Sequence, residues 1–192
     1  MRRLLLVRHA PTSATRAAAF PLDEPLDERG LASAAALPRA LPRRCEVMSS
    51  PALRCRQTVE AAGLTATAEP RLSECDFGSW AGATLADVHA SDPQGAGVWM
   101  IDPDAAPHGG EPLREFFSRV AKWLDDQAAG EGAAAAITHA GVVKAALVHA
   151  LGAPLDAFWR LDAAPLSVTD LRAHDGRWTV SRVNCPVSGG AG

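Results

Sequence analysis

Two basic side chains follow the first apolar run of the chain. Arg8 and His9 come directly after residues 4–7, a short run typical of a buried strand, and the ends of such strands are where α/β proteins build ligand sites. A neutral imidazole held at one ring nitrogen can act as a nucleophile through the other, and a guanidinium suits phosphate oxygens. The pair predicts a nucleophilic His9 beside an anion-binding Arg8. On these two residues alone, a strand-end role without chemistry stays open.

Three later segments carry further side chains suited to phosphoryl transfer, each where a strand gives way to a helix or loop. Arg54 lies in Ser49–Thr58, Glu74 in Leu72–Trp80, and His139 in Thr138–Lys144. Such a reaction needs donors around the phosphate oxygens and an acid for the leaving oxygen. Arg54 and a protonated His139 would be donors and Glu74 the acid. A surface salt bridge for Arg54 and a structural role for His139 are the alternatives.

In this order, the four segments resemble the histidine phosphatase superfamily, also called the phosphoglycerate mutase-like family. The likeness runs from Leu4 to about Val183, and the blocks 76–80 and 107–112 look most like short bacterial phosphatases of the α-ribazole phosphatase type. The resemblance implies a phosphohistidine on His9, an acid role for Glu74 rather than Asp76, and no metal or cofactor. It also implies a phosphate pocket formed by Arg8, Arg54 and His139.

The chain departs from the family pattern next to the nucleophile. Ala10-Pro11 replaces the usual Gly-Glu, and Thr15 stands where an Asn often helps to hold phosphate. Thr15 can still donate one hydrogen bond, so it stays in the predicted phosphate site. Helices starting near Pro51 and Ala140 are expected to direct N–H groups toward the same rim, which adds Ala140 to the site.

The composition is that of a globular chain and excludes several kinds of partner. The 192 residues are 47% apolar and 21% charged, and the net charge of −3 argues against nucleic-acid binding. The longest apolar runs are too short to span a membrane, and the four cysteines lack metal-site spacing. We expect a cytoplasmic monomer or homodimer that acts on a small phosphomonoester, with no membrane association.

The pattern of apolar runs predicts a three-layer α/β/α fold. Strands are expected at 3–7, 45–49, 133–138, 166–172 and 178–183, and helices at 29–40, 51–62, 112–129 and 141–151. Their alternation indicates a mainly parallel sheet, and Asp175-Gly176 indicates a hairpin that makes an antiparallel edge. Residues 73–111 show turn signals and little periodicity, so they are expected to form a long lid-like excursion. One domain at 1–185 and a disordered tail at 186–192 complete the prediction.

The function predicted from these features is metal-independent hydrolysis of a phosphomonoester through a phosphohistidine, with α-ribazole 5'-phosphate as the substrate that the resemblance suggests. Two alternatives stay open. One is a broad-specificity sugar-phosphate phosphatase or a phosphoglycerate mutase. The other is a non-catalytic regulator that binds a phosphorylated ligand on the same fold. Trp80 and Trp99 are candidates for lining the substrate's organic half.

Overall fold

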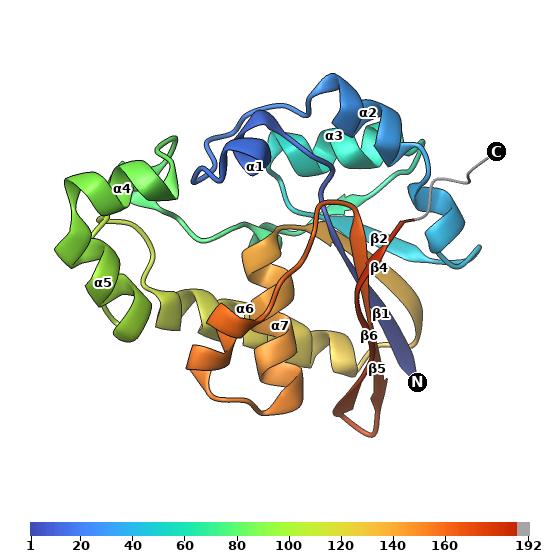
Figure 1. The fold of residues 1–192 in the computed structure, drawn as a ribbon. Helices are drawn as coiled ribbons and strands as arrows, with labels where there is room; N and C mark the ends of the chain where they lie inside the picture. Colours follow the sequence, from blue (N-terminus) through green and yellow to red (C-terminus); the bar gives the residue numbers. More distant parts are fainter. Residues whose placement is uncertain (188–192) are drawn as a thin grey trace.

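A six-stranded mixed sheet forms the centre of residues 1–187, the part of the chain that the computed structural model describes (Figure 1). The spatial order is β3-β2-β4-β1-β5-β6, with β1 paired in parallel to β4 and antiparallel to β5. The strands are β1 (Arg2–Arg8), β2 (Glu46–Ser49), β3 (Thr67–Ala68), β4 (Gly132–Thr138), β5 (Ser167–His174) and β6 (Arg177–Pro186). The predicted mixed sheet with an antiparallel edge is confirmed.

Helices cover both faces of this sheet, which confirms the three-layer α/β/α architecture. Alternate residues of β1 point to opposite faces: Leu4 and Leu6 join one core, and Leu5 and Val7 join the other. The first core packs against α6 (Leu113–Ala128) and α7 (Ala140–Leu151), and the second against α3 (Leu53–Ala61). In Figure 1, α2 (Glu28–Ala34) and α3 lie on one side of the sheet, and α6 and α7 lie on the other.

The expected helix at 29–40 is two shorter pieces. α2 ends at Ala34, and a 3₁₀ turn follows at Leu37–Ala40 with Pro38 in its first turn. A proline lacks the N–H that a continuing α-helix would need, so the break falls there. Outside the excursion at 73–111, four elements of the described chain were not predicted: the short strand β3, the five-residue helix α1 (Ser13–Ala17), and the 3₁₀ turns at Pro70–Leu72 and Leu155–Arg160.

The excursion at 73–111 contains more helix than its sequence pattern indicates. It holds a 3₁₀ turn at Gly78–Trp80 and the helices α4 (Leu85–Ser91) and α5 (Pro93–Ile101), which project to one side of the molecule in Figure 1. The backbone of Phe20 exchanges hydrogen bonds with Gly82 and Ala83, 2.9 Å each, which ties the excursion to the loop after α1. A 3₁₀ turn at Leu155–Arg160 follows α7 and brings Trp159 against Trp99.

The last strand extends one residue past the expected domain boundary at 185. Pro186 pairs with Ser167 as the last residue of β6, and the Val187 N–H donates to the carbonyl of Leu166 over 2.9 Å. The expected tail at 186–192 is therefore corrected at its first two positions, and residues 188–192 lie outside the described residues. Among residues 1–187, no helix is both long and apolar enough to cross a lipid bilayer.

Candidate active site

The parallel pairing of β1 and β4 brings His9 and His139 together. Arg8 is in register with Thr138, and the His9 N–H donates to the carbonyl of Thr138 over 2.8 Å. Each histidine is the residue directly after its strand, and the two ring centroids lie 5.3 Å apart. Because parallel strands end at the same edge of a sheet, residues far apart in sequence meet here, as the sequence analysis expects.

His9 is held as a neutral imidazole with one nitrogen free. Its side chain is only 4% exposed, and Nδ1 lies 2.7 Å from the carbonyl oxygen of Ala10. A carbonyl can only accept, so Nδ1 carries the proton and Nε2 keeps its lone pair. Burial, and then the charges of Arg54 and Arg8, lower the pKa of His9 to about 3. These are the properties of a nucleophilic imidazole.

Arg54 reaches into the same place from the first turn of α3. Its Nη1 donates to the carbonyl of Leu22 at 2.7 Å, and its Nη2 donates to Nδ1 of His139 at 3.1 Å. Nη1 of Arg8 donates a hydrogen bond to the carbonyl of Ala163 at 2.6 Å. Both guanidinium groups line one pocket with both histidines, so the four predicted residues are brought together. The pocket is rich in positive charge, as an anion site requires.

His139 is neutral in this arrangement. Its Nδ1 accepts from Arg54, so Nε2 carries the proton toward Oγ of Ser50 at 2.8 Å. Burial, followed by the charge of Arg54, lowers the pKa of His139 well below its usual value. The role predicted for a protonated His139 therefore depends on an incoming phosphate dianion, whose charge would raise that pKa.

Glu74 lines the same pocket. Its Oε2 accepts from the N–H of Gly141 at 3.1 Å, and its Oε1 accepts from the N–H of Cys75 at 3.1 Å. The guanidinium of Arg119 fixes the segment before it through the carbonyls of Arg71 and Ser73, at 2.8 and 3.0 Å. The carboxylate is thus positioned by the N-terminal turn of α7 and by α6, and it lines the pocket.

Thr15 and Ala140 also line the pocket, but the Thr15 hydroxyl is already engaged. It donates to the carbonyl of Thr12 at 2.8 Å and accepts from the Thr12 N–H at 2.9 Å, in the capping box that begins α1. A hydroxyl has one proton, so Thr15 must give up this bond to donate to phosphate. Ala140 is the first residue of α7, directly after His139.

The pocket has a volume of ≈ 280 Å³ and an aromatic wall that the sequence analysis identified only in part. Trp99 lines it, whereas Trp80 does not, because Trp80 is packed in the core against Phe20. Phe77 and Trp159 lie on the same wall. These side chains come from separated segments with no shared periodicity, so sequence spacing gave no signal for them.

Glu24 is a further polar residue of the pocket that the sequence analysis missed. Its Oε1 accepts from the Thr12 hydroxyl at 3.1 Å, and its Oε2 lies 3.9 Å from Nη1 of Arg54. Glu24 lies in a loop whose sequence carries no motif. Its contacts with Thr12 and Arg54 form only when these separate segments pack together. Within residues 1–187, no group of three His, Cys, Asp or Glu side chains is arranged to hold a metal ion.

Comparison with known families assigns the chain to one of them. A model of the histidine phosphatase superfamily (branch 1) matches residues 4–186. The chain belongs to this superfamily, and its fold is that of the superfamily. A solved mycobacterial glucosyl-3-phosphoglycerate phosphatase in complex with VO₃ superposes with a TM-score of 0.84 at 27% identity, over 96% of this chain and 100% of the other.

Two curated relatives extend the comparison. A bifunctional protein of Mycobacterium tuberculosis is 34% identical over 195 residues, which cover 95% of this chain and 53% of the relative. The chain therefore spans about half the length of that relative. A glucosyl-3-phosphoglycerate phosphatase of Mycolicibacterium vanbaalenii is 28% identical, over 94% of this chain and 96% of the relative. The solved α-ribazole phosphatase of Shigella flexneri, at 23% identity and a TM-score of 0.81, covers 95% of this chain and 96% of its own and supports the fold alone.

Proposed function

We propose that the chain hydrolyses phosphomonoesters through a phosphohistidine on His9. The observation that carries the proposal is the fixed tautomer of His9, whose Nδ1–H donates to the carbonyl of Ala10 and leaves Nε2 unprotonated, in a pocket that His9 lines with Arg8 and Arg54. A neutral imidazole between two guanidinium groups can attack phosphorus while the charge on the equatorial oxygens is stabilised.

The reaction takes place in two balanced steps. In the first, the lone pair of His9 Nε2 forms a bond to phosphorus, the bond from phosphorus to the ester oxygen breaks, and a protonated Glu74 gives its proton to the departing oxygen. In the second, a water oxygen attacks phosphorus, the bond to Nε2 breaks, and Glu74 takes a proton from the water. Inorganic phosphate leaves. Arg8, Arg54 and His139 hold the phosphoryl oxygens through both steps, with Ala140 and Thr15 at the rim.

For the substrate, the full-length likeness to relatives named glucosyl-3-phosphoglycerate phosphatase favours a phosphorylated sugar or sugar acid. α-Ribazole 5'-phosphate is the second candidate, because Trp99, Phe77 and Trp159 form a wall on which a planar base could stack. Side-by-side values of kcat/KM on glucosyl-3-phosphoglycerate and α-ribazole 5'-phosphate distinguish these candidates.

The test of the reaction uses p-nitrophenyl phosphate in the presence of EDTA. We expect turnover to persist with EDTA, because the guanidinium groups supply the charge that a metal supplies elsewhere, and to vanish in His9→Ala. His174→Ala is the matched control, since that side chain is 78% exposed at the end of β5. Mass spectrometry of enzyme trapped during turnover should place the phosphoryl group on His9. Strict dependence on added magnesium, or full activity of His9→Ala, would contradict the proposal.

A further inference from the structure

A second cavity adjoins the phosphate pocket, and Glu74 lines both. It is ≈ 180 Å³ in volume, and it shares Glu74, Phe77, Trp99, Ala140 and Trp159 with the first. Because Glu74 lies on the shared lining and is the proposed proton donor to the leaving oxygen, the alcohol part of a bound phosphomonoester would extend into this second cavity. The groups on its walls are therefore those that meet the organic half of a substrate.

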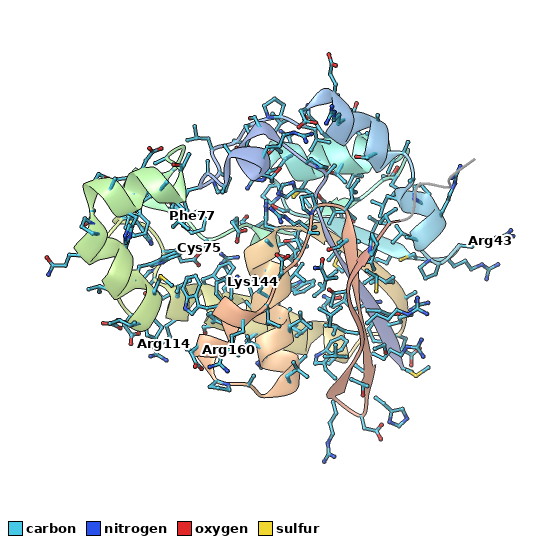
Figure 2. The ribbon with its side chains drawn as sticks, viewed as in Figure 1. Arg43, Cys75, Phe77, Arg114, Lys144 and Arg160 are labelled. Carbon is cyan, nitrogen blue, oxygen red and sulfur yellow. The ribbon has the colours of Figure 1, made fainter. Side chains whose placement is uncertain are left out.

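Lys144 is the one cationic side chain that lines this second cavity among the described residues. It lies on α7 three residues after Gly141, whose N–H binds Glu74, so the two positions share one face of the helix. Figure 2 shows Lys144 on the side of α7 that is turned toward the segment with Cys75 and Phe77. Its Nζ lies 3.9 Å from the centroid of the Phe158 ring and 5.7 Å from that of Trp159.

This ammonium group has aromatic contacts but no ion pair within residues 1–187. Burial lowers the pKa of Lys144, and the negative charges of Glu74 and Asp162 act against this. A partly buried cation costs free energy unless an anion pairs with it, and a cavity beside it offers the place for one. Faces of aromatic rings hold the ammonium group in position without neutralising its charge.

We propose that Lys144 is a specificity-determining residue that binds a carboxylate on the leaving alcohol of the substrate. The inference rests on the proposed phosphatase function and adds the substrate class: phosphomonoesters of small hydroxy acids. A carboxylate fits better than a second phosphate, because one ammonium group with three donors can pair with a monoanion, whereas a dianion in this small aromatic cavity would lack further donors.

The test compares two substrates that differ at one carbon, 3-phosphoglycerate and glycerol 3-phosphate. We expect the intact chain to favour the carboxylate by about tenfold or more in kcat/KM, the usual effect of a hydrogen bond to a charged group. Lys144→Met should reduce that ratio at least tenfold, chiefly through KM for 3-phosphoglycerate, and Lys144→Arg should retain part of it. Lys122→Met is the matched control, because Lys122 is the only other lysine of the chain and is exposed on α6. This variant should keep the substrate ratio of the intact chain.

The outcomes separate this inference from the function on which it rests. Turnover of p-nitrophenyl phosphate with a substrate ratio near one, or no turnover of 3-phosphoglycerate, would overturn the role of Lys144 and leave the phosphatase proposal standing. Equal losses on both substrates in a folded Lys144→Met protein would also overturn it. No turnover of any phosphomonoester would refute the proposed function and the inference together.

Discussion

Nη2 of Arg54 donates a hydrogen bond to Nδ1 of His139 over 3.1 Å, while Nη1 of the same guanidinium is bound to the carbonyl of Leu22. One planar group thus joins three parts of the chain: the helix after β2, the end of β4 and the loop after α1. A lysine has a single nitrogen and cannot make both bonds in this geometry.

We therefore expect Arg54→Lys to lower kcat/KM for phosphomonoesters by about 100-fold, through the loss of one charge-assisted contact to the transferring group and of the bond that orients His139. Inhibition by inorganic phosphate should weaken in parallel. Arg56→Lys, two residues along the same helix and exposed, is the control. Steady-state kinetics at saturating and limiting substrate would decide this, and a change below threefold would contradict it.

The low pKa of His9 should appear in the pH dependence of stability. The native imidazole has a pKa of about 3 against an ordinary value of 6.5, so the unfolded chain binds more protons between these limits. Stability then rises with pH across this window and is lost as pH falls through it, with a slope of up to about 1.4 kcal/mol per pH unit from one histidine. Urea unfolding of His9→Gln between pH 4 and 7 should show a shallower slope. An unchanged slope would indicate that His9 is charged in the native state.

Glu74→Gln should affect substrates according to their leaving groups. An amide has a single acceptor oxygen, so it can keep only one of the hydrogen bonds from Gly141 and Cys75, and it cannot supply a proton to a departing alkoxide. Turnover of alkyl phosphates should fall about 100-fold, and turnover of p-nitrophenyl phosphate should fall far less, since nitrophenolate leaves without protonation. Equal losses on both types of substrate would remove Glu74 from the acid role.

Arg119 is expected to act on the reaction through Glu74 without touching the substrate. Besides the carbonyls of Arg71 and Ser73, it binds the Glu111 carboxylate at 2.7 Å. Arg119→Met should reduce kcat on alkyl phosphates about tenfold with little change in KM, and should cost about 1–3 kcal/mol of stability through groups left unpaired. Arg114→Met is the control, because Arg114 pairs with Asp104 on the exposed surface. A loss confined to KM would contradict a positioning role.

The strand ends that carry His9 and His139 were predictable because apolar runs of β-forming length mark buried strands whatever surrounds them. Leu4 to Val7 face two cores in alternation, so the whole run must be apolar, and the polar residues must begin where the strand ends. The position of Arg54 followed from its place in a helix directly after β2. These features depend on local sequence, which a single chain displays.

The wall of the site was not predictable, because its members share no local pattern. Thr84 and Asp87 form the capping box of α4, and Asp92 before Pro93 caps α5, and these were the available signals for the two missed helices. α5 carries apolar side chains on all sides, so no period marks it as a helix. The contacts of Glu24 and the cavity beside Lys144 arise only when separate segments pack together.

The pairing of β1 determines when the candidate site can form during synthesis of the chain. Residues 2–8 are synthesised well before their two neighbours in the sheet, residues 132–138 and 168–173. A nascent chain therefore carries His9 long before the site can form, because β4 and β5 must be synthesised first. Fragments that stop before Thr138 should bind no phosphate, so premature termination yields inert chains rather than unregulated hydrolases.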